Sequence, residues 1–258
     1  MKIKDHWEEN AKINNDKYLS MYNESIKNND SFWKKQADRI EWFKKFTKIK
    51  DIKYSKEEVN IKWFEDGELN VSYNCIDRYA KTDPERIAII WEGDDPNNTK
   101  KITYKELLSN VCKIANALKK IGIKKGDRVT IYLTMIPELA YTMLACARIG
   151  AVHSIIFGGF SAESIAGRIQ DCDSEYVITS DEGVRGGKII PLKNTTDKAL
   201  ETCPNVKKCL IIKRTGNRIN LVKDRDIYLD ELTNSVDDFC EPQIMNAEDP
   251  LFILYTSG

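Results

Sequence analysis

The feature that most restricts the fold of this chain is an alternation, beginning near residue 86, of short apolar runs with longer amphipathic segments. The short runs have the composition of buried strands, and the longer segments repeat apolar residues at spacings of three and four, as helices do. Strands that alternate with helices predict right-handed βαβ units, and therefore an α/β fold with a mainly parallel sheet flanked by helices. The predicted strands are 87–91, 128–133, 152–157, 176–179, 209–213 and 251–255, and the predicted helices are 104–121, 137–149 and 161–171.

The first two of these helices carry recognisable start and stop signals. Thr103 and Glu106 form a capping box, in which the Thr hydroxyl accepts a hydrogen bond from the first turn and the Glu side chain reaches back. Pro137 opens the second helix at a position where its missing amide proton costs nothing. Gly122 and Gly150 follow the two helices, where glycine commonly ends a helix. These residues define the predicted helix boundaries.

Residues 1–85 differ in composition from the rest of the chain: they are rich in charged residues and contain four of the five tryptophans. We expect an aromatic-rich helical wrap that packs onto the main body. Within it, Asp30 or Ser31 is predicted to cap a helix that extends to Phe43, and Asn74 is predicted to cap a short helix that continues through Tyr79. The sequence therefore divides into an N-terminal segment, 1–85, and an α/β segment, 86–258.

The charge balance and the hydropathy of the chain exclude several classes of function. The 40 basic and 40 acidic residues cancel, which argues against non-specific nucleic-acid binding. No apolar run approaches the ~20 residues of a membrane span. The first ten residues, MKIKDHWEEN, lack the apolar core of a signal peptide. We therefore expect a cytoplasmic protein with neither a nucleic-acid nor a membrane partner.

The seven cysteines are scattered and contain no C-x-x-C pair, which is typical of free thiols in a reducing compartment. The two histidines, His6 and His153, are far apart in the sequence, so no metal-ligand cluster is predicted in this segment. His153 lies within a predicted strand. It could be a buried structural histidine or a general base, and the sequence leaves both open.

Two loops at the predicted carboxyl ends of strands have the composition of ligand-binding loops, since ligands bind at that edge of a parallel sheet. In the first, Gly158 and Gly159 would let backbone amides approach a ligand, although a tight turn alone would also need glycine. In the second, Arg185 and Lys188 flank a Gly-Gly pair, so both cations can turn onto one phosphate. A solvated surface turn would look the same. No G-x-G-x-x-G pattern is present, which gives dinucleotide binding little support.

A third loop is the end of the sequence, where an apolar run leads into Thr256, Ser257 and Gly258. Hydroxyls followed by glycine resemble the start of a loop that cradles phosphate. Because a domain rarely ends in this way, we expect the chain to be the first part of a longer protein. A strand tip without any ligand is the alternative.

At these loops the sequence resembles the adenylate-forming acyl-CoA synthetases, and among them most closely the acetyl-CoA synthetases. The similarity covers nearly the whole chain from about residue 20. The terminal Tyr-Thr-Ser-Gly is shared by the superfamily, whereas Gly-Glu-Leu-Asn-x-Ser-Tyr-Asn-Cys together with Phe-Gly-Gly-Phe-Ser is more specific. Propionyl-CoA synthetases usually differ at the first of these motifs, which favours acetate. The matching stretches are 63–75, 102–107, 126–129, 135–138, 145–163, 181–188 and 255–258.

The resemblance implies a ligase that works in two steps. Acetate attacks the α-phosphate of Mg-ATP to give acetyl-adenylate and pyrophosphate, and the thiol of coenzyme A then displaces AMP to give acetyl-CoA. The implied substrates and cofactors are therefore acetate, ATP, coenzyme A and Mg²⁺. The resemblance also implies that residues Arg185, Gly186, Gly187 and Lys188 hold the nucleotide 3′-phosphate of coenzyme A, that Gly159 lies near its pantetheine, and that Thr256, Ser257 and Gly258 begin the ATP phosphate loop.

Many relatives have Arg where this chain has Lys188, and a lysine keeps the charge without the bidentate geometry. The Mg²⁺ ligands, the acyl pocket and the catalytic lysine of the family would all follow residue 258. No catalytic residue and no metal ligand is therefore assigned here, and we expect no ligase turnover from this chain alone. Two alternatives stay open: a propionyl-CoA or other short-chain acyl-CoA synthetase, and a non-catalytic module that binds coenzyme A or a nucleotide.

Overall fold

The computed structural model describes residues 5–256. Contacts divide the chain into two units, one formed by the residues up to Leu69 with Asn246–Glu248, and one formed by Asn70–Met245 with the residues from Asp249 onward. Each unit is described below by itself. The domain boundary near residue 85 stays a prediction.

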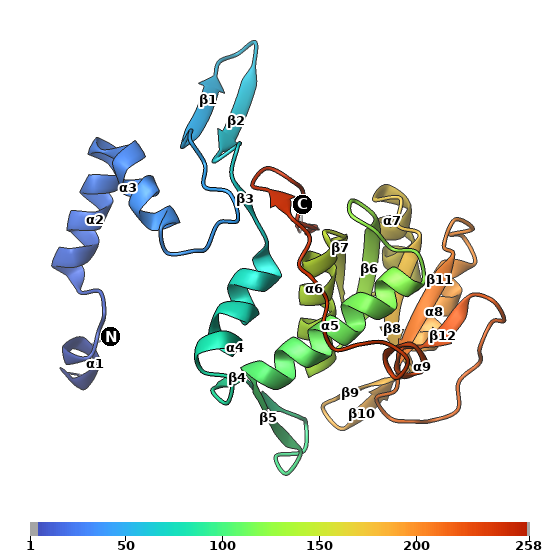
Figure 1. Ribbon diagram of the computed structural model, residues 1–258. Helices are drawn as coiled ribbons and strands as arrows, with labels where there is room; N and C mark the ends of the chain where they lie inside the picture. The colour runs from blue at the N-terminus through green and yellow to red at the C-terminus, as the bar shows by residue number, and fades with distance from the viewer. Residues whose placement is uncertain (1–4, 257–258) are drawn as a thin grey trace. The chain divides into compact units, whose positions relative to one another are not determined.

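The second unit is built on a six-stranded sheet with the order β12-β11-β8-β6-β7-β14 (Figure 1). Every pairing in this sheet is parallel, so the predicted α/β class with a mainly parallel sheet is confirmed. The last strand is shorter than predicted. The strands are β6 (Arg128–Leu133), β7 (Val152–Phe157), β8 (Tyr176–Ser180), β11 (Lys208–Ile212), β12 (Asp226–Tyr228) and β14 (Phe252–Ile253).

Helices cover both faces of the sheet because alternate strand residues point to opposite sides. On one face Ile131, Ile178 and Leu210 belong to a core that includes α5, α6 and the first residue of α9. On the other face Val177 and Ile211 belong to a core shared with α7 and α8. The helices are α5 (Tyr104–Lys120), α6 (Pro137–Ile149), α7 (Ala162–Asp171), α8 (Leu192–Leu200) and α9 (Leu229–Thr233), of which α8 and α9 were not predicted.

The helix ends follow the predicted signals. Thr103 and Glu106 form both hydrogen bonds of a capping box at the start of α5. Pro137 is the first residue of α6, and Gly150 ends that helix in the left-handed conformation with φ of 74°. These residues are local determinants, so their role did not depend on tertiary context.

Two antiparallel hairpins of the second unit lie outside the main sheet. The predicted strand 87–91 is found as β4 (Ile87–Glu92), but it pairs with β5 (Thr99–Thr103) and not with the parallel sheet. The second hairpin consists of β9 (Gly183–Arg185) and β10 (Lys188–Ile190). The sequence predicts a loop in this second segment, because strands of three residues leave almost no periodic signal.

The first unit contains short helices, a hairpin and an aromatic cluster. The rings of Trp42, Phe46 and Phe64 lie 4.5–5.6 Å apart, and Trp33 packs edge-on against Trp63 at 5.6 Å. These aromatic residues therefore pack against one another within the unit. Its elements are α1 (Asp5–Glu9), α2 (Asn15–Lys27), α3 (Asn29–Ala37), β1 (Lys50–Tyr54), β2 (Val59–Trp63) and β3 (Glu68–Leu69), and the chain passes between the units at β13 (Met245–Asn246).

Two local predictions about residues 28–82 were wrong. The cap expected at Asp30 or Ser31 is instead Asn28, since α3 spans Asn29–Ala37 and ends before Phe43. The helix that includes η1 (Tyr73–Asp77), a π-helical turn, and α4 (Arg78–Thr82) begins at Val71, so Asn74 lies inside it. Asn70 is the capping residue instead, because its Oδ1 accepts a hydrogen bond from the amide of Tyr73 at 3.1 Å.

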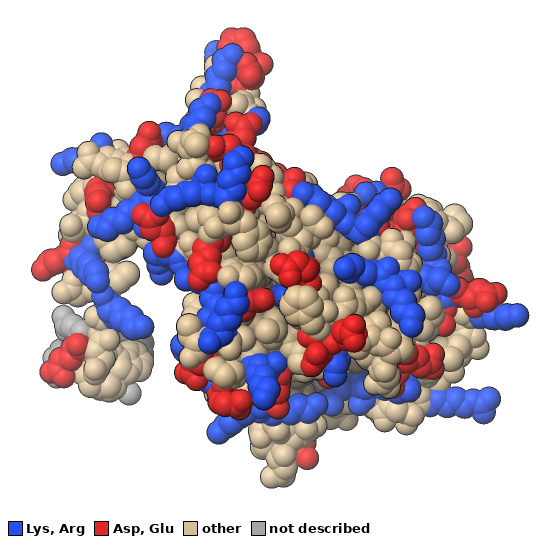
Figure 2. All heavy atoms as spheres, viewed as in Figure 1, with Lys and Arg blue, Asp and Glu red and all other residues tan. Residues whose placement is uncertain are grey.

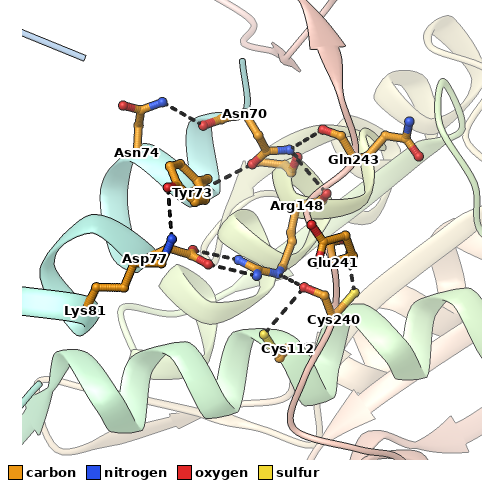
Figure 3. A network of polar contacts seen from close by, with 11 residues as sticks. Asn70, Tyr73, Asn74, Asp77, Lys81, Cys112, Arg148, Cys240, Glu241 and Gln243 are labelled. Atoms are coloured by element: carbon orange, nitrogen blue, oxygen red, sulfur yellow. Dashed lines mark hydrogen bonds and ion pairs between the residues drawn. The ribbon is translucent and has the colours of Figure 1, made fainter. Parts of the chain in front are cut away.

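A buried polar network joins this helix to the end of α6 and to residues 240–243 (Figure 3). The guanidinium of Arg148 donates to both carboxylate oxygens of Asp77, at 2.8 and 3.0 Å, and its Nε donates to the carbonyl of Cys240 at 2.6 Å. Asn70 is fully buried, and its Nδ2 donates to the carbonyls of Ala147, Arg148 and Gln243. The network therefore supplies hydrogen bonds to the carbonyls of Ala147 and Arg148 in the last turn of α6, where a helix leaves carbonyls without intrahelical partners.

The surface carries charges of both signs. Figure 2 shows basic and acidic side chains interspersed over the visible face. Among the described residues, no helix has both the length and the apolar composition that crossing a membrane requires.

Candidate functional site

The order of the strands places a switch point at the carboxyl ends of β6 and β8. The connection from β6 to β7 uses α6 on one face, whereas β7 reaches β8 through α7 on the other face. The loops that leave β6 and β8 therefore turn toward opposite faces of the sheet, and a crevice opens between them. Open α/β sheets bind ligands in such a crevice. The loops that follow β6, β7 and β8 all meet at this edge.

A cavity of about 310 Å³ lies at this edge of the sheet. Its volume falls at the small end of the range of ligand pockets, and its walls mix apolar with polar side chains. They include Phe157 and Gly158 at the end of β7, Val184 and Arg185 of the β9–β10 hairpin, Trp91, Glu92, Gly93 and Asp94 of the β4–β5 hairpin, Leu133, Thr134, Met135 and Ile136 at the end of β6, and Arg214.

The β9–β10 hairpin aligns two cations on one side. Gly186 and Gly187 form its two-residue turn with φ of 56° and 71°, a conformation that favours glycine. Arg185 and Lys188 are direct cross-strand partners in this hairpin, so their side chains share a face. Like charges in this position repel one another, and an anion between them would relieve that repulsion.

Both cations are exposed, and neither forms an ion pair within residues 5–256. The guanidinium of Arg185 lies over the ring of Phe157, 5.3 Å from its centroid. Gly159 is next to it, since a Cβ built on Gly159 would lie 3.5 Å from Nη1 of Arg185. The structure therefore brings Gly159, predicted from one loop, together with Arg185, predicted from another.

Two acidic residues that sequence reasoning left without a role shape this cavity. Asp94 accepts a hydrogen bond from the amide of Gly187 at 3.2 Å, which ties the two hairpins together. Asp181 is 1% exposed and accepts from the amides of Arg214 and Gly216, both at 2.8 Å. Arg214 then lies 5.1 Å from the centroid of Trp91 on the cavity wall. The only sequence signal for Asp181 was its place after a buried strand.

Thr256, the start of the predicted phosphate loop, follows β14 and is exposed. Because β14 runs parallel to β7, Thr256 leaves the sheet at the same edge as Gly159, but it makes no hydrogen bond in the described part of the chain. Tyr255, just before it, donates to a carboxylate oxygen of Asp171 at 2.6 Å. Ser257 and Gly258 lie outside the described residues.

His153 lies near the amino end of β7, and the cavity is at the other end of that strand. It is 4% exposed, and its ring packs against Phe252 at 5.7 Å. Burial lowers its pKa from 6.5 to about 4, so the imidazole is neutral at neutral pH. This placement favours the structural interpretation of His153 over the general base.

We expect the imidazole of His153 to stay neutral during acidification, because its surroundings penalise the charged form. Its ¹H–¹³C NMR signals, assigned with a His153→Gln variant, should keep their neutral positions as the pH falls from about 8 to about 5.5. In the unfolded chain His153 takes up its proton near pH 6.5, whereas in the folded protein it does so only near pH 4. The free energy of unfolding therefore decreases as the pH falls below 6.5. A titration midpoint close to 6.5 in the folded protein would contradict the assignment.

Among residues 5–256 no group of three or more His, Cys, Asp or Glu side chains is arranged to hold a metal ion.

Two family models match the chain. Residues 76–258 match the family described as AMP-binding enzyme, and residues 18–75 match the one described as acetyl-coenzyme A synthetase N-terminus. The first match covers most of the second unit, including the parallel sheet and both hairpins.

Individual relatives agree with these matches. The chain is 57% identical over 252 residues to an acetyl-coenzyme A synthetase of Parvibaculum lavamentivorans, a match that covers 98% of this chain and 39% of the relative. It is 56% identical over 261 residues to one of Mesorhizobium japonicum, covering 100% of this chain and 40% of the relative. A solved structure of acetoacetyl-CoA synthetase from Streptomyces lividans aligns with a TM-score of 0.83 at 25% identity, over 93% of this chain and 36% of that one.

The chain thus spans about two-fifths of the length of the curated relatives that it matches. The parallel sheet with its switch-point cavity and the family match over residues 76–258 lead to the same assignment. This chain belongs to the AMP-binding enzyme family.

Proposed function

We propose that this chain is part of an AMP-forming acetate–CoA ligase, and that its switch-point cavity receives the nucleotide end of coenzyme A. The whole reaction would convert acetate and ATP into acetyl-adenylate and pyrophosphate, and then acetyl-adenylate and coenzyme A into acetyl-CoA and AMP. The identity of 57% to an acetyl-coenzyme A synthetase supports acetate over other acids. Free thiols at all seven cysteines fit a protein of the reducing cytoplasm.

The observation that carries this proposal is the pair of cations on one face of the β9–β10 hairpin, neither of which forms an ion pair within residues 5–256. Arg185 and Lys188 face the same side across a glycine turn, beside a cavity large enough for part of a ligand. A guanidinium can donate two parallel hydrogen bonds to a phosphate, and a lysine adds a point charge. A terminal phosphate monoester, such as the 3′-phosphate of coenzyme A, suits this pair.

The surrounding residues would orient that phosphate. The ring of Phe157 supports the guanidinium of Arg185, and Asp94 holds the turn through the amide of Gly187. Gly159 leaves the space beside Arg185 open, so that a ligand can run past it along the end of β7. Thr256 leaves the sheet at the same edge, and together with Ser257 and Gly258 it would begin the ATP phosphate loop. The described residues bind and orient the substrate in this scheme, and the bond-making steps are assigned to residues outside them.

We expect Arg185→Ala to weaken the binding of coenzyme A about 10- to 100-fold, because hydrogen bonds to charged groups contribute about 1.5–3 kcal/mol. Dephospho-coenzyme A, which lacks the 3′-phosphate, should lose less than about twofold. Isothermal titration calorimetry measures both affinities, in the longer ligase of which we propose this chain to be a part. Lys188→Ala should show the same selectivity with a smaller loss, since lysine lacks the bidentate geometry.

Arg218→Ala is the matched control, because Arg218 is exposed and does not line the cavity. It should leave both affinities unchanged. If Arg185→Ala lost equal affinity for coenzyme A and for dephospho-coenzyme A, residues 185–188 would not be the site that binds the 3′-phosphate. Acetyl-CoA formation by the 258-residue chain alone would show that the bond-making residues have been assigned to the wrong part of the protein.

A further inference from the structure

A second cavity, of about 330 Å³, lies among α5, α6, α9 and the end of β11, and it shares no lining residue with the switch-point cavity. We call it the α5–α9 cavity. Its lining combines residues from elements that are far apart in the sequence: Asn110, Lys113 and Ile114 from α5, Glu138 and Tyr141 from α6, Ile212 and Lys213 at β11, and Leu229, Asp230, Thr233 and Asn234 at α9. The proposed acetate–CoA ligase reaction gives this cavity no role.

The floor of the α5–α9 cavity is formed by residues of the protein core. Ile114, Ile212 and Leu229 are 5–7% exposed and belong to the core that covers this face of the sheet. Tyr141 is also only 7% exposed, yet its hydroxyl has no hydrogen-bond partner within residues 5–256. The hydroxyl stands at the wall of the cavity, so it is free to donate a hydrogen bond to a molecule that enters.

Two opposite charges line this cavity, and no ion pair joins them in the described part of the chain. Lys113 on α5 and Glu138 on α6 both line it and are half-buried, but neither forms an ion pair within the described residues. The other two charged groups already neutralise one another, because Nζ of Lys213 lies 2.7 Å from a carboxylate oxygen of Asp230. The cavity therefore offers one ammonium and one carboxylate to a ligand.

This pattern selects the class of ligand. An inorganic anion would be repelled by Glu138, and a metal ion by Lys113, so a ligand with a single charge would leave one of the two groups unpaired. A small zwitterion satisfies both. An apolar side chain on the same molecule would cover the isoleucine and leucine floor, and burying that apolar area adds affinity.

We propose that the α5–α9 cavity binds a free α-amino acid with an aliphatic side chain. Its carboxylate would be held by Lys113 and by the hydroxyl of Tyr141, its ammonium by Glu138, and its side chain by Ile114, Ile212 and Leu229. Burial, with the negative charges of Glu138 and Glu106, raises the pKa of Tyr141 to about 12. The phenol therefore keeps its proton and acts as a hydrogen-bond donor at neutral pH.

Isothermal titration calorimetry of the 258-residue chain with L-valine, L-leucine, L-isoleucine and L-methionine tests the proposal. At least one of these should bind saturably at a single site. For the amino acid that binds best, the analogue without its ammonium and the analogue without its carboxylate should each bind at least about tenfold more weakly, because each loses a charge-assisted contact. For leucine these analogues are 4-methylpentanoate and 3-methylbutylamine.

Variants of the lining locate the site. Glu138→Gln and Lys113→Met should each weaken binding at least about tenfold, and Tyr141→Phe should weaken it severalfold while preserving the ring. Lys119 lies on α5 like Lys113 but does not line the cavity, so Lys119→Met should leave the affinity for the amino acid unchanged. The proposal fails if none of the four amino acids binds saturably. It also fails if the analogues that lack the ammonium or the carboxylate bind as well as the amino acid, or if Glu138→Gln and Lys113→Met both bind it normally. The analogue comparison uses the unaltered chain, so it decides the matter even if a variant does not fold.

Discussion

Replacing Arg148 with methionine should lower the free energy of unfolding by about 3–5 kcal/mol, because it leaves the Asp77 carboxylate buried without its partner. The guanidinium makes two hydrogen bonds to Asp77 and one to the carbonyl of Cys240, and the side chains of Arg148 and Asp77 are only 2% and 11% exposed. The substitution removes all three contacts at once (Figure 3). Urea unfolding followed by circular dichroism measures the loss.

The double variant Asp77→Asn/Arg148→Met separates the charge effect from the loss of packing. It should be more stable than Arg148→Met alone, since no unpaired carboxylate remains in it. Lys207→Met is the matched control, because its partner Glu175 is a surface group and the pair is 59% and 40% exposed. That change should have little effect on unfolding. The single variant Asp77→Asn completes the cycle. If the stability losses of Asp77→Asn and Arg148→Met summed to that of the double variant, the ion pair would not be the stabilising unit.

A second large effect is expected at Asp226, in the edge strand β12. Its side chain is fully buried together with that of Lys193, whose Nζ lies 2.9 Å from Oδ2, and Arg225 donates to the other oxygen at 2.6 Å. Asp226→Asn preserves the shape of the side chain. It leaves Lys193 and Arg225 with a single carboxylate to share, that of Asp197. We expect a loss of about 3–5 kcal/mol at neutral pH, measured by the same urea unfolding.

This effect should depend on pH in a defined direction. Burial alone would raise the pKa of Asp226, but hydrogen bonds from Arg225, the amide of Val222 and Lys193 outweigh it, so the pKa lies below its ordinary value of 3.8. A carboxyl with a lowered pKa stabilises the folded state fully above its unfolded value and loses that contribution as the pH falls through the folded one. The stability difference between the natural chain and Asp226→Asn should therefore be constant above about pH 5 and narrow below pH 3.8.

Glu175→Gln, which alters the surface partner of Lys207, is the control for this titration. It should not reproduce the narrowing, since both groups of that pair are solvated. A stability difference for Asp226→Asn that stayed the same from pH 5 to pH 2.5 would show that the carboxylate contributes nothing as a charge.

Patterns along the chain predicted most of the parallel sheet and its helices correctly. The strands β6, β7, β8 and β11 and the helices α5, α6 and α7 lie where apolar periodicity and the signals at Thr103, Pro137 and Gly150 placed them. These signals act within one or two helical turns, so neighbouring residues suffice to produce them. The short elements β9, β10 and α9 were missed because they are too short to show a clear period, and the nine-residue helix α8 was missed as well.

The candidate phosphate site was predicted in part for the same reason. The residues Arg185 to Lys188 are adjacent in the chain, so their composition alone indicated a turn with two cations. Their role in binding coenzyme A stays a prediction, as does that of Gly159 and Thr256. The contributions of Asp94 and Asp181 could not be predicted, because each acts on residues that lie about 30–90 positions away.

What the sequence determined by itself was therefore local: the class of fold, the helix ends and the loops with the composition of binding sites. Only the tertiary structure decided that Ile87–Glu92 leaves the parallel sheet for a hairpin, that Asn70 and not Asn74 caps its helix, and which charges are buried in pairs. The physical reason is that hydrogen-bond partners and burial are set by residues brought together from distant parts of the chain. In the sequence, Asp77 cannot be distinguished from a carboxylate on the surface. Its partner Arg148 lies 71 residues away along the chain, and only folding brings the two side chains together.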